Sequence, residues 1–228
     1  MGKVHILSFS DEPFQDRKEA GRLLGQVLSN LKIEKAVVLG IPRGGVIVAR
    51  EVSNSLDANM DIVLSHKLGA PFNPELAIGA VSEDGKVFLD DAIISQVDIK
   101  DTYIKKEGER QLAEIRRRVT SYRKILSKLE LKEKTVIITD DGVATGATMQ
   151  ASLWAARQEK PNRLIAALPV GPRDTIERLA EYSDEIICLR TPMFFSAVAQ
   201  FYIQFEQTTE EEVIEILKEA GERRGNLP

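Results

Sequence analysis

The sequence predicts an α/β protein whose central sheet is doubly wound and mostly parallel. Short continuous apolar runs are typical of strands that are buried on both faces, and they occur at residues 36–41, 61–66, 134–139, 163–170 and 185–189. Most of these runs are separated by segments with the apolar spacing of helices, which is the pattern of strand–helix–strand units. One interruption, residues 67–130, breaks the pattern with a hairpin signal and a long charged segment.

Length and charge limit the class of protein. The 228 residues are enough for a single domain, 1–228. The net charge of -4 argues against a nonspecific nucleic-acid binder, which is usually basic. No apolar run approaches the roughly 20 residues of a membrane helix, and the single cysteine, Cys188, excludes an intrachain disulfide. We expect a cytoplasmic protein with no membrane segment and no nucleic-acid partner.

The expected helices follow from apolar spacing and capping residues. Residues 14–31 predict an amphipathic helix with Ser10 or Asp11 as its cap. Further helices are expected at residues 46–56, 146–157 and 172–182. The last helix should begin at Thr208 or Thr209, because each has a glutamate three residues later, as in a capping box.

Residues 67–90 are expected to form a loop followed by a hairpin outside the main sheet. Two prolines and a glycine in K-L-G-A-P-F-N-P-E indicate a loop, and Asp84-Gly85 between two apolar runs is a strong hairpin signal. Residues 101–130 then predict a long helix with a narrow apolar seam. The seam comprises Leu112, Ile115, Val119, Tyr122, Leu126 and Leu129.

The basic residues of this helix leave two interpretations open. They lie mostly off the seam, at Arg116, Arg117, Arg118, Arg123 and Lys124. The seam packs either against the body or against a partner subunit, with the charges in water. The alternative is that some of these arginines contact a phosphate.

Residues 139–148, T-D-D-G-V-A-T-G-A-T, have the composition of a phosphate cup. They follow a predicted strand, and open α/β folds bind ligands at the carboxyl ends of their strands. Gly142 and Gly146 let backbone N–H groups approach an anion. The following helix N-terminus adds partial positive charge, and Thr145 and Thr148 add hydroxyl donors. Neither G-x-x-x-x-G-K-[ST] nor G-x-G-x-x-G after the first strand is present.

The adjacent carboxylates Asp140 and Asp141 would repel a phosphate, so they must serve another part of the ligand. Carboxylates accept hydrogen bonds from a vicinal diol, or bind a divalent cation through oxygen. A molecule with a phosphate at one end and a diol a few ångströms away is a ribose 5-phosphate. The sequence therefore predicts a sugar phosphate that is bound at both ends.

Residues 136–148, V-I-I-T-D-D-G-V-A-T-G-A-T, resemble the phosphoribosyl pyrophosphate motif of type I phosphoribosyltransferases. Thr139 and Gly142 depart from the usual form, in which aliphatic residues are commoner. G-I-P-R-G-G, residues 40–45, is similar to the pyrophosphate loop of that family, and residues 65–85 resemble the segment that leads into its mobile active-site loop.

Together with F-Y-I-Q-F-E-Q at residues 201–207, these motifs are similar to a subgroup of the family whose substrate is unassigned. The resemblance covers roughly residues 10–215. It implies a core at about 33–190, a mobile loop and hairpin at about 67–90, and a homodimer. It also implies a small hood built from residues 1–30, residues 191–228 and the long helix, and a strained, even cis, peptide in the pyrophosphate loop.

The pyrophosphate end of such a ligand needs cations and backbone donors. Arg43 supplies a guanidinium, Gly44 and Gly45 supply N–H groups at a helix start, and Lys67 adds a second positive charge. His66 is either a proton partner for the base or a strand-end histidine with a local hydrogen bond. Mg²⁺, the expected cofactor, would bridge pyrophosphate and sugar, held by Asp140 and Asp141 directly or through water.

These arguments predict one set of site residues. The predicted catalytic residues are Arg43, Lys67, Asp140 and Asp141. The predicted substrate-binding residues are Arg43, Gly44, Gly45, Lys67, Asp140, Asp141, Gly142, Val143, Ala144, Thr145, Gly146, Ala147 and Thr148.

The acceptor is poorly specified by the sequence. The aromatic side chains Phe194, Phe195 and Tyr202 either stack on a planar base or form the core of the hood. Enzymes of the family that act on 6-oxopurines commonly have an acidic residue in the place of Ala144, so this position is more similar to adenine-type enzymes. The predicted reaction is Mg²⁺-dependent transfer of phosphoribosyl from phosphoribosyl pyrophosphate to a nucleobase or related nitrogen nucleophile. The alternative is a noncatalytic regulatory protein that binds phosphoribosyl pyrophosphate or a nucleotide.

Overall fold

The computed structural model describes residues 2–31, 33–89, 94 and 99–225. Its main feature is a six-stranded sheet with the order β1-β9-β8-β7-β2-β3, in which every neighbouring pair is parallel. The predicted fold class, a doubly wound and mostly parallel α/β sheet, is confirmed. The strands are β1 Lys3–Ser8, β2 Ala36–Gly40, β3 Asn59–Ile62, β7 Thr135–Thr139, β8 Arg163–Val170 and β9 Glu185–Arg190.

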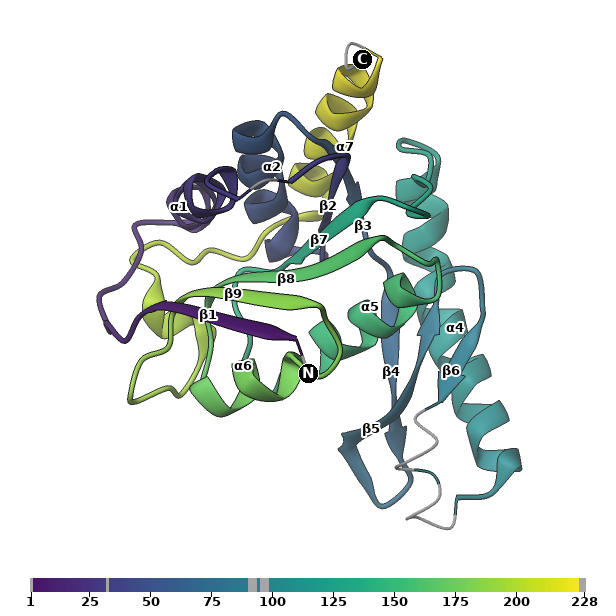
Figure 1. Cartoon of the computed structure of the whole chain (residues 1–228). Helices are drawn as coiled ribbons and strands as arrows, with labels where there is room; N and C mark the ends of the chain where they lie inside the picture. The colour runs from purple at the N-terminus through teal and green to yellow at the C-terminus, as the bar shows by residue number, and fades with distance from the viewer. Residues whose placement is uncertain (1, 32, 90–93, 95–98, 226–228) are drawn as a thin grey trace.

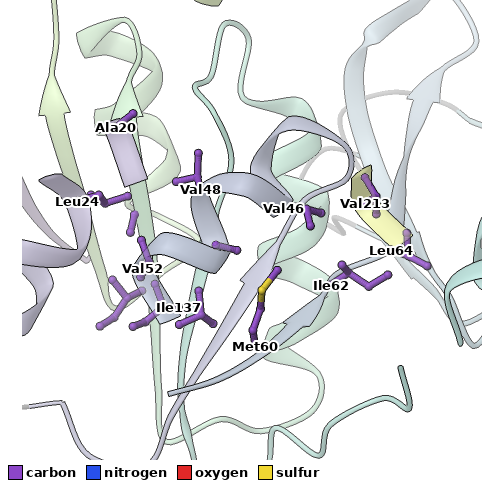
Figure 2. Close-up of a cluster of buried hydrophobic side chains, with 14 of the residues drawn as sticks. Ala20, Leu24, Val46, Val48, Val52, Met60, Ile62, Leu64, Ile137 and Val213 are labelled. Atoms are coloured by element: carbon purple, nitrogen blue, oxygen red, sulfur yellow. The ribbon is translucent and has the colours of Figure 1, made fainter. Parts of the chain in front are cut away.

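Helices cover both faces of this sheet, and each face has its own apolar core (Figure 1). One face is covered by α1 (Arg17–Ser29), α2 (Gly44–Leu56) and α7 (Glu210–Arg224), and the other by α5 (Ala147–Arg157) and α6 (Arg173–Leu179). Figure 2 shows part of the first core, in which Leu24 of α1, Val52 of α2 and Ile137 of β7 are completely buried. A two-sided core explains why the central strands are apolar at nearly every position.

A second sheet lies beside the first and is antiparallel. It contains β4 (Ser65–Ala70), β5 (Asn73–Ser82) and β6 (Val87–Leu89). The predicted hairpin is confirmed by the pairing of β5 with β6 and by Gly85, whose φ of 80° suits the turn. The prediction of a loop from residue 67 was wrong, because residues 67–70 belong to β4 and only Pro71 and Phe72 form a turn. The run 61–66, predicted as one strand, is divided between β3 and β4.

The long helix α4 (Asp101–Arg123) packs on β4, and it ends earlier than the predicted residue 130. Ile115 and Tyr122 of its seam are buried within this chain, so the seam no longer argues for a homodimer. At three places α4 is fixed to the rest of the fold. Its Tyr103 hydroxyl donates to the carbonyl of Gly69 at 2.9 Å, Gln111 Oε1 lies 2.9 Å from His66 Nδ1, and Arg123 binds Asp61.

Asp61, which is 1% exposed, joins β3 to three other segments. One carboxylate oxygen accepts from Arg123 at 2.6 Å, and the other accepts from the N–H of Leu129 at 2.8 Å. Arg224 of α7 lies 3.5 Å from the same carboxylate. Arg123 also donates to Glu83, at the hairpin turn, at 2.9 Å. These contacts fix the hairpin and the end of α4 to the edge of the central sheet.

Two predictions at the N-terminus need correction. Residues 3–8, which were grouped with the hood, form the edge strand β1 and pair with β9 in the central sheet. Helix α1 begins at Arg17, and its cap is Asp16, whose carboxylate accepts from the N–H of Glu19, not Ser10 or Asp11. The predicted capping box of the last helix is confirmed at Thr209 with Glu212. The helix predicted at 172–182 is shorter, Arg173–Leu179.

Residues 14–16 and 201–206 lie together at the carboxyl end of the sheet. Phe14 and Tyr202 form a parallel bridge, and the N–H of Ile203 donates to the carbonyl of Phe14 at 2.8 Å. The short 3₁₀ helix η1 (Val198–Phe201) precedes this bridge. A segment from each end of the chain therefore stands beside the predicted site.

Candidate functional site

The two loops with the strongest sequence signals are neighbours in space. They follow β2 and β7, which are adjacent strands of the sheet, and the N–H of Ile41 donates to the carbonyl of Thr139 at 3.0 Å. The loop after β2 contains a cis peptide between Pro42 and Arg43. Parallel strands bring their carboxyl ends to one edge, so convergence of these loops follows from the topology.

Gly44 and Gly45 allow the two loops to touch. A Cβ atom on Gly44 would lie 2.0 Å from Oδ2 of Asp141, and one on Gly45 would lie 2.8 Å from the Cα of Asp140. Any larger residue at either position would push the acidic pair away from the start of α2. The glycines therefore place the predicted pyrophosphate loop directly against the predicted ribose-binding residues.

The loop 142–148 is held from behind by α6, with its amides left open. Thr175 donates to the carbonyl of Ala144 at 2.9 Å, and Arg178 donates to the carbonyl of Thr145 at 2.8 Å. Within a trans peptide group the C=O and the N–H point in opposite directions. The N–H groups of Thr145 and Gly146 share peptide groups with these two carbonyls, so they point away from α6. Within the described residues neither N–H makes a hydrogen bond.

Gly146 caps α5 with a φ of 74°, a conformation that favours glycine. Thr145 and Thr148 are exposed at this helix start. Val143, by contrast, is buried, and its N–H donates to the carbonyl of Val170 at 3.0 Å, so Val143 anchors the loop to β8. Open amides, two hydroxyls and a helix N-terminus together suit an anion such as phosphate.

The acidic pair is crowded and only partly compensated. Burial raises the pKa of Asp140 well above its usual range, and the charge of Asp141 raises it further. Burial also raises the pKa of Asp141, although its hydrogen bond with Arg17 acts in the opposite direction. Asp140 Oδ1 accepts from the N–H of Asp141 at 2.8 Å. Added positive charge or hydroxyl donors would therefore stabilise the two carboxylates here.

Three residues lie around Asp141. The sequence does not identify Arg17 or Phe205 as site residues, and it indicates Tyr202 only for stacking on a base or for the core of the hood. Arg17 Nε donates to Asp141 Oδ2 at 2.7 Å, and its guanidinium lies 3.8 Å from the ring centre of Phe205. The hydroxyl of Tyr202 donates to the carbonyl of Asp141 at 2.5 Å. Arg17 and Phe205 are far from the motif in sequence, and no local pattern marks them.

The two predicted cations lie on different walls of the site. Arg43 is half-buried, and its side chain makes no hydrogen bond or ion pair with the residues that the structure describes. Lys67, on β4, lines a cavity of about 490 Å³ together with Pro42 and Thr148. The topology thus brings Lys67 next to both predicted loops, although it belongs to the second sheet.

The sequence left open whether the aromatic side chains stack on a base or form the core of the hood. In the structure these side chains have different environments. Tyr202 is 6% exposed and packs against Phe14 and Phe205, and Phe195 stacks on Phe201 with ring centres 5.2 Å apart. Phe194, in contrast, is 80% exposed. Tyr202 and Phe195 therefore belong to a packed core, and of these three side chains Phe194 is the one whose ring is exposed to solvent.

The acidic pair also fits the expected Mg²⁺. Among the described residues no group of three or more His, Cys, Asp or Glu side chains gathers to hold a metal. Mg²⁺ is usually held by one or two carboxylates together with waters and substrate oxygens. Asp140 and Asp141, whose pKa values are raised by crowding and burial, supply such a pair.

The fold and the site together define a class of protein: a doubly wound α/β fold with a loop suited to an anion and an acidic pair at one sheet edge. The sequence matches the phosphoribosyl transferase domain family over residues 15–206, which is most of the chain. The chain therefore belongs to that family, which confirms the resemblance that its motifs indicate. Within the described residues no helix is both long and apolar enough to cross a membrane.

Individual relatives agree with this assignment. The chain is 42% identical over 207 residues to two proteins of Mycobacterium tuberculosis, "Putative phosphoribosyl transferase MT0597" and its counterpart Rv0571c. This alignment covers 91% of the chain but 47% of those proteins, so the chain spans about half of their length. The crystal structure of TT1426 from Thermus thermophilus is also 42% identical, with a TM-score of 0.88 over 92% of this chain and 99% of that one.

Proposed function

We propose that this protein transfers the phosphoribosyl group of phosphoribosyl pyrophosphate to a nucleobase or a related nitrogen nucleophile. In this reaction the bond from C1 of the ribose to pyrophosphate breaks, a bond from C1 to nitrogen forms, and the acceptor loses a proton. The observation that carries the proposal is the contact between two loops of opposite character: Gly44 of the cation-bearing loop lies against Asp141 of the acidic pair.

Each end of the donor has a counterpart in the site. The open N–H groups of Thr145 and Gly146 and the hydroxyls of Thr145 and Thr148 suit the 5-phosphate. Asp140 and Asp141 suit the ribose hydroxyls, because carboxylates accept two such hydrogen bonds. For the ribose to reach Asp141, the hydroxyls must share or replace its contact with Arg17.

The leaving pyrophosphate requires positive charge that is already in place. Arg43, whose side chain has no partner among the described residues, and Lys67 supply it from two sides, and the start of α2 adds N–H groups at Gly44 and Gly45. Mg²⁺, when bound at Asp140 and Asp141, would neutralise charge on the pyrophosphate. These residues therefore stabilise charge that develops as the C1 bond breaks.

The acceptor is expected to lie beside the ribose, under the segment that contains Phe194. Residues 191–206 and 10–16 would form the hood, and movement around the turn at Pro71 and Phe72, away from the hairpin end that Arg123 holds, would exclude water during the reaction. A homodimer and a cytoplasmic location remain part of the proposal. No contact among the described residues specifies which acceptor the protein uses.

The test is release of pyrophosphate from phosphoribosyl pyrophosphate with Mg²⁺, measured over a panel of purines, pyrimidines and other amines. Release that depends on one acceptor supports the proposal and identifies the substrate. Tight donor binding without turnover on any acceptor would instead support a noncatalytic regulatory protein. Failure to bind the donor at all would overturn both.

A further inference from the structure

The cavity beside the pyrophosphate loop has a wall that is formed by the long helix. Its volume is about 490 Å³, and it extends from Pro42 and Thr148 across β4 to α4. The wall on α4 includes Glu107, Gln111 and Arg118. A helix that interrupts the α/β pattern therefore faces the same space as Lys67.

The helix is held rigidly in this position. His66 Nδ1 lies 2.9 Å from Gln111 Oε1, and the amide nitrogen of Gln111 donates to Glu107 at 2.8 Å. Further along the helix, Arg123 is bound to Asp61 and Glu83. Side chains on this face of α4 therefore have fixed positions relative to β4 and the pyrophosphate loop.

The basic residues of α4 have different environments. Arg123 is neutralised by Asp61 and Glu83, and Arg110, 63% exposed, pairs with Glu107 at 2.7 Å. Arg116 and Arg117 are exposed. Of these five arginines, Arg118 alone is half-buried at the cavity with a side chain that makes no hydrogen bond or ion pair to the described residues.

Among the described residues that line the cavity, basic side chains outnumber acidic ones. Glu107 is the acidic residue among them, and Arg110 and Gln111 already occupy its carboxylate. Lys67 and Arg118 contribute cations. A partly buried guanidinium without a counter-ion is unfavourable, and an anion in the cavity would remove that cost.

Arg118 lines the same cavity as Pro42 of the pyrophosphate loop. The pKa of Tyr122, one turn further along α4, is raised by burial and by Glu210, and the positive charges of Arg118 and Arg43 act in the opposite direction. The pyrophosphate loop and α4 therefore form two walls of one cavity, and Arg118 stands on the second wall.

We propose that this cavity binds the diphosphate end of the donor, and that Arg118 of α4 is one of its ligands together with Lys67. The inference rests on the proposed function, because it deepens the role of the same site. It makes the long helix a part of the binding surface and not only a support for the second sheet. Guanidinium groups suit this role because they bind phosphate oxygens in pairs.

The experiment compares Arg118→Gln, Arg118→Lys and the exposed neighbour Arg117→Gln by calorimetry, with pyrophosphate, ribose 5-phosphate and phosphoribosyl pyrophosphate in the presence of Mg²⁺. Loss of a charge-assisted hydrogen bond to phosphate should weaken binding of pyrophosphate and of the donor by about 10- to 100-fold in Arg118→Gln. Arg118→Lys should lose less, and Arg117→Gln should match the wild type. Binding of ribose 5-phosphate should be unchanged in all three, which also shows that the variants are folded.

The outcomes separate the two proposals. If the wild type binds the donor and Arg118→Gln binds it equally well, the role of Arg118 is wrong and the proposed function stands. If all three ligands weaken together, Arg118 supports the fold and does not bind the diphosphate, which also overturns the inference. If the wild type binds neither donor nor pyrophosphate, both the role of Arg118 and the proposed function are wrong.

Discussion

Two clusters of buried carboxylates differ in how their charge is compensated. Asp61 accepts from Arg123 and from the N–H groups of Ile62 and Leu129, with Arg224 close by. Asp140 accepts from one backbone N–H, that of Asp141, and faces a second carboxylate. The first cluster is compensated within the chain, whereas the second has one cation, Arg17, for two carboxylates.

The number of donors distinguishes a buried carboxylate that stabilises the fold from one that can bind a ligand. A buried carboxylate with a full set of donors holds segments together and has little to offer a ligand. A buried carboxylate with too few donors reduces stability until something supplies them, and such groups are typical of functional sites. The same residue type therefore fixes α4 at one end of β3 and prepares a binding site at the end of β7.

The largest expected effect is on stability, at Asp61. Replacement by alanine leaves Arg123 and Arg224 buried without their main partner, and it should reduce the free energy of unfolding by about 3–5 kcal/mol. The measurement is urea denaturation at pH 7.5. Glu177→Ala, which removes an exposed ion pair with Arg173, should change it by no more than about 0.5 kcal/mol. A loss at Asp61 no larger than this control would contradict the comparison.

The next effect is on affinity, at Asp141. Asp141→Asn keeps the shape of the side chain but removes its charge and one acceptor. It should weaken binding of phosphoribosyl pyrophosphate by about 10- to 100-fold while the thermal midpoint stays within a few degrees. Calorimetry with the donor and Mg²⁺ measures this, and Asp57→Asn, in an exposed pair with Arg223, serves as the control. Unchanged affinity would remove the assigned role of Asp141.

The smallest effect, opposite in sign, is expected at Asp140. Because burial and Asp141 raise its pKa, the ionised group lowers stability at neutral pH. Asp140→Asn should therefore raise the free energy of unfolding of the ligand-free protein by about 1 kcal/mol at pH 7.5, at the expense of donor binding. Urea denaturation at two pH values provides the measurement.

The raised pKa of Asp140 determines how the effect of Asp140→Asn on the free energy of unfolding should change with pH. A carboxyl with a raised pKa in the folded state holds a proton that the unfolded chain releases, so its contribution to stability improves as the pH falls towards the folded pKa. The advantage of Asp140→Asn over the wild type should therefore shrink on acidification. An advantage that grows at lower pH would show that Asp140 is well compensated after all.

Much of the fold could be predicted because its central strands are buried on both faces. β8 and β9 were recognised as apolar runs, since nearly every residue packs against one helix layer or the other. β1 was missed because it is an edge strand with alternating half-buried and exposed residues and contains Lys3, His5 and Ser8. The start of the second sheet was missed because Pro71 marks a two-residue turn, which from sequence is indistinguishable from a longer loop.

The site could be predicted where it is local in sequence. The loops at 40–45 and 139–148 are each continuous, and the adjacency of their strands brings them together. Arg17 and Tyr202 reach Asp141 only through the packing of distant segments, and no spacing in the sequence records that contact. The sequence could not distinguish Arg118 from Arg117 either, because their difference depends on which side of α4 faces β4.

The contacts of Asp61 have a consequence for the length of the segment between β3 and β7. The chain leaves the central sheet after β3 and returns beside the same carboxylate, through the N–H of Leu129, before β7 begins. The two ends of this segment therefore meet at one side chain, and loop-closure entropy depends only weakly on the length of chain between such points. Extra residues at the exposed turn of Pro71 and Phe72 should thus cost little stability, whereas changes to β4 and β5 would disturb their packing on α5.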